Sequence, residues 1–324
     1  MRALSFDSFG SPSKVLSEIE RPMPEPGPGQ VRVKLVLAPI HNHDLMIITG
    51  HYGYKPPLPH APGTEAVGIV DKLGEGVTNL KVGQRVAGSG SSTWAEYYLG
   101  DARRLVPVPD SISDEVACQM ISMPLSARLL LEIMEIKAGD WIIQNAANGA
   151  VGKMLVGFGR DLGINVVGLV RRDAGIAELA EAGVDRIVST EAEGWQDRVK
   201  ATTGGAPIIR GLESIGGKAA DEMLGVMAEG SRIYSFGALS GRPLQVSAEN
   251  LLFKSARIEG FWLQRLGQTT PPEILGRLIG EIVRKAAVGK LDLEVGGRFG
   301  LGDYAAAVDA ATTAGRPGKI VFTG

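Results

Sequence analysis

A short turn between two apolar segments constrains the fold of this 324-residue chain more than any other feature. The apolar residues 141–143 precede it, the turn itself spans residues 145–152, and an apolar-periodic stretch follows over residues 153–162. A strand that turns into a helix presents free N–H groups and the positive end of the helix dipole to a pyrophosphate, and glycines let the phosphates approach. We therefore expect a dinucleotide site at Asn145, Ala147, Asn148, Gly149, Ala150, Val151 and Gly152.

The motif alone also fits an ordinary strand-to-helix turn, because Ala147 replaces the first glycine of the usual pattern. The context favours the dinucleotide site. Downstream patterns predict strands at residues 165–170, 186–189, 208–215, 231–236 and 257–261, and helices at residues 174–182, 195–202 and 218–228. This alternation predicts an α/β fold, a doubly wound parallel (Rossmann) sheet with helices on both faces.

The end of the second predicted strand indicates which nicotinamide cofactor binds. A carboxylate there would accept hydrogen bonds from the ribose of NAD, but this chain has Arg171 and Arg172. A guanidinium group suits a 2′-phosphate, so the sequence favours NADPH over NADH. The alternative is that both arginines are simply solvated, and the nearby Asp173 weakens the preference.

The remaining patterns divide the chain into two domains. Short strands with glycine and proline turns predict a small β-rich domain from residue 1 to residue 112. Residues 113–264 form the dinucleotide-binding domain. This domain is followed by a helical stripe over residues 273–288, a helix over residues 304–311 and a strand over residues 318–323. Residues 265–324 are expected to complete the first domain.

Composition narrows the possible partners and the compartment. A net charge of −2 provides no basic excess for nucleic acid or for an anionic membrane surface. The single cysteine, Cys118, excludes an internal disulfide framework and a thiolate zinc cluster. Residues 1–10 lack a signal-peptide core, and no apolar run reaches transmembrane length. We therefore expect a cytoplasmic enzyme with a small-molecule substrate.

All four histidines, His41, His43, His51 and His60, fall within 20 residues, which suggests a metal site because imidazole is a common zinc ligand. The layout of the chain, however, resembles the medium-chain dehydrogenase/reductase superfamily, whose zinc-dependent members carry Gly-His-Glu where this chain has Gly63-Thr64-Glu65. The resemblance therefore implies no metal. We expect the histidines to be ordinary loop or cleft residues, with His51 lining a pocket.

Four segments narrow the resemblance. Residues 44–52, 144–148, 215–218 and 260–263 together resemble the zinc-free trans-2-enoyl-CoA or enoyl-ACP reductases of mitochondrial type, which are related to the quinone oxidoreductases. The resemblance implies a GroES-like catalytic domain beside the Rossmann domain and a role in fatty acid metabolism. It further implies hydride transfer from NADPH to the β-carbon of an unsaturated thioester, and a homodimer joined near residues 257–260.

Tyr52 is the catalytic residue that the resemblance implies. Hydride addition places negative charge on the thioester oxygen, and a phenolic O–H can stabilise the enolate or supply its proton. On local sequence alone, a tyrosine in a glycine-rich and proline-rich loop is more often a surface residue. The carboxyl ends of later strands are expected to complete the cofactor site through Phe236, Gly237, Phe261 and Trp262, and the substrate pocket is expected at Asn42, His51, Met123 and Trp262. Trp262 could instead be a packing residue.

Two departures from the family pattern leave other functions open. The family's Asn-Pro-Ser-Asp is His41-Asn42-His43-Asp44 here, and residues 123–128 also differ from the family's Asn-Pro-x-Thr-Ala-Tyr. Changed pocket polarity alters substrate choice more readily than it alters hydride chemistry. An NADPH-dependent quinone or alkenal reductase is therefore one alternative, and an NADPH-binding protein without turnover is another.

Overall fold

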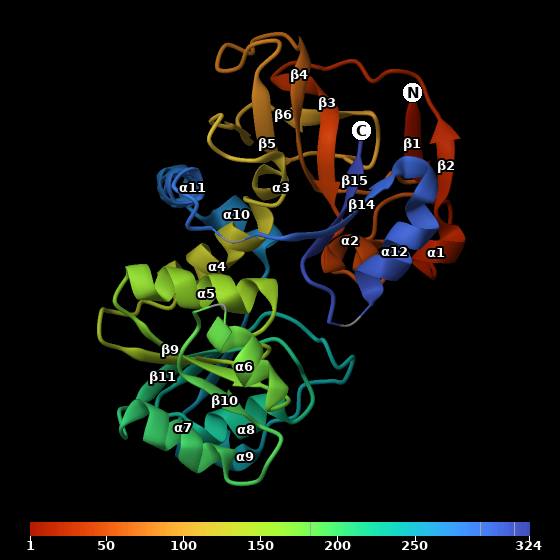
Figure 1. The fold of residues 1–324 in the computed structure, drawn as a ribbon. Helices are drawn as coiled ribbons and strands as arrows, with labels where there is room; N and C mark the ends of the chain where they lie inside the picture. Colours follow the sequence, from red (N-terminus) through yellow and green to blue (C-terminus); the bar gives the residue numbers. More distant parts are fainter. Residues whose placement is uncertain (182, 292, 314) are drawn as a thin grey trace. The chain divides into compact units, whose positions relative to one another are not determined.

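The structure, a computed structural model, describes residues 1–181, 183–291, 293–313 and 315–324. The chain divides into two compact units, shown in Figure 1. The first contains Met1–Met123 and Ile279–Gly324, and the second contains Pro124–Leu278. The predicted boundaries, after residues 112 and 264, lie earlier in the chain. The first segment of this unit reaches Met123, and Glu65 accepts hydrogen bonds from the backbone N–H groups of Ile121 and Ser122, whereas residues 265–278 belong to the second unit.

The second unit is built on a six-stranded parallel sheet. Its strands are β8 (Trp141–Gln144), β9 (Asn165–Val170), β10 (Ile187–Ser189), β11 (Ile208–Glu213), β12 (Arg232–Ser235) and β13 (Arg257–Gly260). Their order in the sheet is β10-β9-β8-β11-β12-β13, and every pairing is parallel. The order reverses direction at β8, which is the topology of a doubly wound sheet. The predicted α/β fold is confirmed.

Helices connect these strands. They are α5 (Ala150–Asp161), α6 (Ala174–Glu181), α7 (Trp195–Thr203), α8 (Ala219–Val226) and α9 (Ala248–Phe253). Helix α7 contacts α8, and α8 contacts α9, so these three lie together in Figure 1. Residue 182, the predicted end of α6, lies outside the described residues. Apolar residues from the strands and helices, including Ile143, Val167 and Trp195, form the buried core.

Three further helices lie at or near the unit boundaries: α4 (Ser122–Ile133), α10 (Leu263–Thr269) and α11 (Pro272–Ala287). Pro124 lies in the first turn of α4, where a missing N–H group costs no helical hydrogen bond. The preceding short helix α3 (Asp114–Ala117) is capped by the side chain of Ser113, which accepts from the N–H of Val116. No helix in the described part of the chain is long and apolar enough to span a membrane.

The first unit is rich in β-structure. One small sheet pairs β1 (Arg2–Ser5) with β2 (Ser17–Glu20). The larger sheet has the order β14-β15-β3-β4-β5-β7, with β6 also paired to β3. Its strands are β3 (Gln30–Pro39), β4 (Glu65–Leu73), β5 (Arg85–Ser89), β6 (Tyr97–Asp101), β7 (Leu105–Pro107), β14 (Val295–Gly300) and β15 (Lys319–Thr323). Strand β15 pairs with β3, so the end of the chain returns to the first unit.

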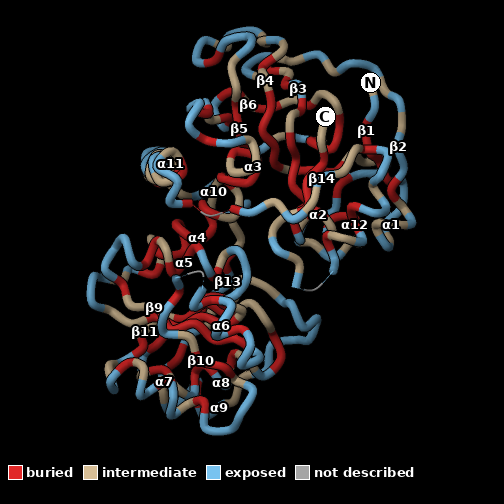
Figure 2. The backbone as a smooth tube through the Cα atoms, viewed as in Figure 1, coloured by how far each residue is buried: buried red, intermediate tan, exposed pale blue. Residues whose placement is uncertain are grey.

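Strand β3 illustrates how the sequence produces this sheet. Val31, Val33 and Leu35 alternate with less buried residues, and all three belong to the core. Side chains alternate between the two faces of a strand, so this spacing buries one face. Figure 2 shows the buried residues concentrated along the strands. Helices α1 (Pro12–Val15), α2 (Asn42–Ile48) and α12 (Tyr304–Thr312) accompany the sheets.

Candidate active site

The predicted cofactor turn joins the end of β8 to the start of α5. Gly149 is the N-cap residue of α5 and provides no side-chain acceptor for the first helical turn. The first N–H groups of a helix have no intrahelical acceptor, so those of Ala150, Val151 and Gly152 can bind an anion. Gln144 supports the turn by donating from Nε2 to the carbonyl oxygen of Gly152 at 2.9 Å.

Close packing inside the turn explains the need for small residues. A Cβ atom at Gly152 would lie 2.7 Å from the carbonyl oxygen of Ala147 and 2.8 Å from its Cα atom. Ala146 has a φ of 50°, a left-handed conformation that costs a non-glycine residue roughly 1 kcal/mol. Since no bulky side chain occupies the start of α5, the residues present fit a pyrophosphate.

Asn145 belongs to a buried hydrogen-bond network that the sequence analysis missed. Its Nδ2 donates to Glu213 Oε1 at 3.0 Å, and its Oδ1 accepts from the N–H of Ser214 at 2.8 Å. The same Glu213 oxygen accepts from the N–H groups of Ile215 and Gly216, each at 2.7 Å. This network joins the ends of β8 and β11. The signal available in the sequence was a glutamate, Glu213, within the predicted strand at residues 208–215.

The other predicted cofactor residues follow the carboxyl ends of strands in the same unit. Arg171 and Arg172 come directly after β9 and are exposed. Phe236 follows β12 and Phe261 follows β13, and their rings stack with centroids 5.3 Å apart. Gly237 and Trp262 are the next residues in the chain. Because the strands are parallel, these residues and the cofactor turn lie at the same edge of the sheet.

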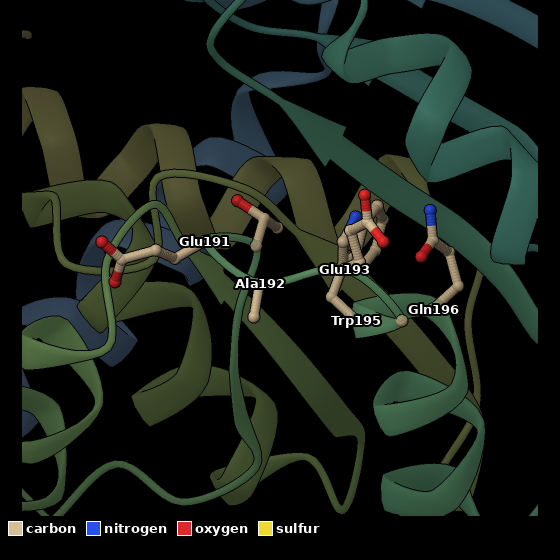
Figure 3. Close-up of a pocket in the computed structure, with 7 residues that line it drawn as sticks. Glu191, Ala192, Glu193, Trp195 and Gln196 are labelled. Carbon is tan, nitrogen blue, oxygen red and sulfur yellow. The ribbon is translucent and has the colours of Figure 1, made fainter.

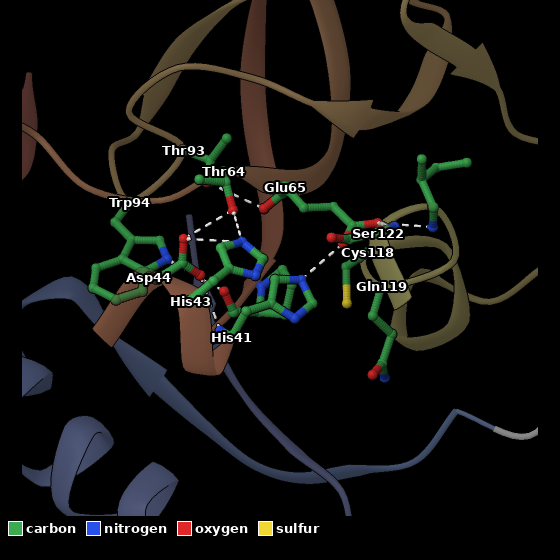
Figure 4. A network of polar contacts seen from close by, with 12 residues as sticks. His41, His43, Asp44, Thr64, Glu65, Thr93, Trp94, Cys118, Gln119 and Ser122 are labelled. Carbon is green, nitrogen blue, oxygen red and sulfur yellow. Dashed lines mark hydrogen bonds and ion pairs between the residues drawn. The ribbon is translucent and has the colours of Figure 1, made fainter. Parts of the chain in front are cut away.

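In the first unit, His41 and Glu65 form a fully buried pair, shown in Figure 4. His41 Nε2 lies 2.7 Å from Glu65 Oε2, and Glu65 Oε1 accepts from the N–H groups of Ile121 at 2.8 Å and Ser122 at 3.0 Å. Burial raises the pKa of Glu65 to about 7 and lowers the pKa of His41 well below its ordinary value. His41 lies in the short loop before α2, as expected, but its ring is fully buried and lines no open cleft.

A second set of contacts links His43, Thr64 and Asp44. His43 Nε2 lies 2.7 Å from Thr64 Oγ1, and Thr64 Oγ1 donates to Asp44 Oδ1 at 2.8 Å. Asp44 Oδ2 accepts from the backbone N–H of His41 at 2.9 Å. The rings of His41 and His43 stack with centroids 4.9 Å apart. The sequence analysis assigned no role to Asp44, Thr64 or Glu65.

Tyr52 lies just after α2 and packs, partly buried, against the core of the first unit. Its ring centroid is 5.9 Å from that of His43, with an interplanar angle of 33°. Of the predicted pocket residues in this unit, Asn42 begins α2, His51 is exposed beside Tyr52, and Met123 is partly buried in α4. Trp262 belongs to the second unit. Tyr52 therefore adjoins His43, and Asn42 and His51 are close to both in the chain.

Lys319, at the start of β15, also influences this site. Burial lowers its pKa to about 8, and the positive charge of Arg316 lowers it further, whereas Asp44 and Glu65 act in the opposite direction. No group of three or more His, Cys, Asp or Glu side chains within the described ranges is arranged to hold a metal ion.

A surface pocket of about 350 Å³ lies between β10 and α7, and Figure 3 shows it at close range. Residues 190–196 line it, including the carboxylates of Glu191 and Glu193. Carboxylates disfavour an anionic ligand such as a phosphate. This pocket contains none of the described residues that the sequence analysis assigned to the cofactor or the substrate.

Comparison with known families identifies both units. The alcohol dehydrogenase GroES-like domain family matches residues 27–110, and the zinc-binding dehydrogenase family matches residues 150–279. The first match falls within the β-rich unit. The second starts at α5 and extends through the parallel sheet into α11.

Individual proteins match over nearly the whole chain. The human mitochondrial enoyl-[acyl-carrier-protein] reductase is 30% identical over 319 residues, which cover 96% of this chain and 85% of the relative. The crystal structure of a putative NADPH:quinone reductase from Bacillus thuringiensis is 28% identical and has a TM-score of 0.93, covering 100% of this chain and 98% of that one. A mycobacterial protein complexed with NADPH is 26% identical and has a TM-score of 0.88, with 100% of each chain covered.

These relatives correct the expected compartment. The human, bovine and Arabidopsis thaliana relatives are all named mitochondrial, which contradicts the expectation of a cytoplasmic enzyme. That expectation relied on the single cysteine and on the lack of a signal-peptide pattern and of an apolar run of transmembrane length. These features do not distinguish one reducing aqueous compartment from another.

The predicted resemblance is confirmed by the two family matches, by the 30% identity to enoyl-[acyl-carrier-protein] reductases and by the quinone-reductase-like folds. The chain belongs to the medium-chain dehydrogenase/reductase superfamily of oxidoreductases, within the group that includes the mitochondrial-type enoyl-[acyl-carrier-protein] reductases.

Proposed function

We propose that this enzyme uses NADPH to reduce the C=C bond of an α,β-unsaturated thioester, a trans-2-enoyl-CoA or trans-2-enoyl-ACP. The observation that carries the proposal is the start of α5, which has no side-chain cap and where Gly152 packs closely against Ala147. The chain is also 30% identical to an enoyl-[acyl-carrier-protein] reductase. We assign cofactor binding to the second unit and catalysis to the first.

In this proposal, the cofactor is held by backbone and side-chain groups of the second unit. The N–H groups of Ala150, Val151 and Gly152 bind the pyrophosphate, and Arg171 and Arg172 bind the 2′-phosphate that distinguishes NADPH from NADH. Asn145 fixes the turn through Glu213. Phe236, Gly237, Phe261 and Trp262 complete the site. When bound, NADPH supplies the hydride.

Tyr52 stabilises the charge that develops on the substrate. Hydride addition to the β-carbon makes an enolate, and the Tyr52 hydroxyl donates a hydrogen bond to the thioester oxygen or a proton to the α-carbon. Asn42, His51, Met123 and Trp262 contact the acyl substrate. The contact between the Tyr52 and His43 rings and the packing of Tyr52 against the core support this role, because a catalytic donor must be held in place.

The test is NADPH oxidation with crotonyl-CoA, a longer 2-enoyl-CoA and a simple quinone, assayed in parallel. We expect turnover with the thioesters. Tyr52→Phe should then lower kcat roughly 100-fold with NADPH affinity intact. Tyr54→Phe is the matched control, because this exposed tyrosine lies two residues away and should leave kcat unchanged. Equal rates for the two variants would remove Tyr52 from the mechanism.

A quinone reductase is the second candidate, because the Bacillus thuringiensis protein with a TM-score of 0.93 is named a putative NADPH:quinone reductase. Turnover with quinone alone would assign this function and would count against Tyr52 as the catalytic donor. Tight NADPH binding with no turnover of any acceptor would instead favour a non-catalytic role.

We also propose a homodimer formed through β13. This strand ends the six-stranded sheet and, among the described strands, pairs only with β12. An open edge can pair with the same edge of a second copy. The preceding helix α9 leaves Leu252 70% exposed and Phe253 79% exposed. Sedimentation should show that the wild type is a dimer and that Phe253→Glu shifts the protein toward monomer. A wild-type monomer would contradict the proposal.

A further inference from the structure

The contacts of Thr64 determine which nitrogen of His43 carries a proton. An ionised carboxylate only accepts hydrogen bonds, so the Thr64 hydroxyl donates its hydrogen to Asp44 Oδ1. The oxygen of Thr64 is then the acceptor for His43 Nε2, which must carry a hydrogen. In neutral His43 the other nitrogen, Nδ1, is therefore the one that can take up a proton.

Position and solvent access separate His43 from its neighbour His41. The side chain of His43 is 19% exposed, whereas that of His41 is fully buried. His43 therefore has access to water. Its ring lies between that of His41, at 4.9 Å, and that of Tyr52, at 5.9 Å (Figure 4 shows the histidines). It also stands at the place of the serine in the family pattern noted above, so this arrangement belongs to the present chain.

Carboxylates lie close to the His43 ring. Asp44 Oδ1 lies 3.6 Å from His43 Nε2, and Thr64 bridges the two. Glu65 of β4 adds a second carboxylate, although His41 engages it directly. Lys319 of β15 is the opposing cation. The nearest carboxylate is hydrogen-bonded to the ring through a single hydroxyl, which is the arrangement that orients an imidazole for proton transfer.

We propose that His43 is a positioning and proton-supplying residue that acts through Tyr52. The inference rests on the proposed enoyl reduction. Bound NADPH would supply a hydride to the β-carbon of the substrate, which leaves an enolate. The Tyr52 O–H bond then breaks as its proton forms a C–H bond at the α-carbon, and Tyr52 is left as a phenolate. A proton on His43 Nδ1 then passes to the Tyr52 oxygen, directly or through one water molecule. Water returns a proton to His43, so each turnover consumes one hydride and one solvent proton.

The test is the pH profile of kcat with saturating crotonyl-CoA. His43→Gln should lower kcat roughly 100-fold and remove a pH-dependent limb that the wild type shows, while NADPH affinity stays unchanged. Adding imidazole to His43→Gly should restore part of kcat, an effect that a purely structural role would not produce. His60→Gln is the matched control, since His60 contacts Phe6 outside this network and should keep the wild-type profile.

Thr64 variants keep the inference testable if His43 variants fail to fold. Thr64→Ser retains the hydroxyl and should keep the wild-type profile, whereas Thr64→Val is similar in size and should behave like His43→Gln. Identical profiles for the two Thr64 variants, or a wild-type profile in His43→Gln, would overturn the role of His43. A wild type that does not reduce crotonyl-CoA would instead overturn the proposed function itself.

Discussion

His41 Nε2 lies 2.7 Å from Glu65 Oε2, and the two side chains are 0% and 1% exposed. Burial penalises the charged form of each group, so the pKa of Glu65 is raised to about 7 and that of His41 is lowered. A carboxyl group whose pKa is raised by folding contributes stability at low pH. This contribution is present below about pH 4.5 and is lost as pH rises through 7.

The first prediction concerns Glu65→Gln. The unfolding free energy of the wild type minus that of the variant should decrease between about pH 4.5 and pH 7, by ~3 kcal/mol at most. The lowered pKa of His41 reduces stability at low pH in both proteins. Urea unfolding at several pH values measures the difference. Glu193→Gln, on an exposed loop, should give no such slope, and a flat difference for Glu65→Gln would contradict the assignment.

Gly152→Ala should disrupt the cofactor turn. The added Cβ would lie 2.7 Å from the Ala147 carbonyl oxygen, so the turn must move, at a cost of about 2 kcal/mol. We expect a lower Tm and an NADPH Kd raised more than tenfold. Gly157→Ala is the matched control on the same helix, because its Cβ would have no described neighbour within 4 Å. This control should raise stability by about 0.5 kcal/mol. Equal effects in both variants would show that the close approach is unimportant.

Asn145→Leu should destabilise the second unit. The variant removes the donor to Glu213 and the acceptor for the N–H of Ser214, and it leaves a buried carboxylate with fewer partners. The expected loss is about 2 kcal/mol in urea unfolding. Asn165→Ala, which removes two exposed hydrogen bonds, one to the Gly139 carbonyl oxygen and one from Arg186, should cost less than about 1 kcal/mol. A smaller loss in Asn145→Leu than in Asn165→Ala would mean that the network does not hold the turn.

Arg171→Ala and Arg172→Ala should weaken the binding of NADPH but not that of NADH. Each variant removes a cation proposed to contact the 2′-phosphate, so we expect the Kd of NADPH to rise roughly tenfold and the Kd of NADH to stay constant. Fluorescence titration with each cofactor provides the measurement. Arg160→Ala is the control, because this arginine bonds to the Gly183 carbonyl oxygen and should leave both values unchanged. Parallel changes in both cofactors would rule out a role in the preference.

The sheet of the second unit could be predicted because its strands are short apolar runs separated by helical patterns. Strand β9 was placed correctly at residues 165–170, and the ends of β11 and β12 differed by one or two residues. Helices α9 and α10 were missed. They have six and seven residues, which is too short for an apolar stripe to develop over two full turns.

The candidate site was predicted unevenly for a related reason. Residues 145–152 are contiguous, so their spacing, together with the alternating strands and helices that follow, indicates a phosphate-binding turn. His41 and Glu65 are 24 positions apart, and nothing in their local patterns indicates that they meet. The tyrosine at position 52 was found only through resemblance, whereas its neighbour His43 was treated as an ordinary histidine.

The sequence by itself determined the doubly wound fold and the position of the proposed cofactor turn, because these depend on local periodicity and on a contiguous motif, whereas the superfamily was inferred from resemblance. The tertiary structure decided that His41 is buried against Glu65, that Thr64 bridges His43 and Asp44, and that Glu213 anchors Asn145. These contacts join distant segments through the pairing of strands and the packing of α2 beside β4. Their energies depend on burial and on distance, and neither quantity exists until the chain has folded.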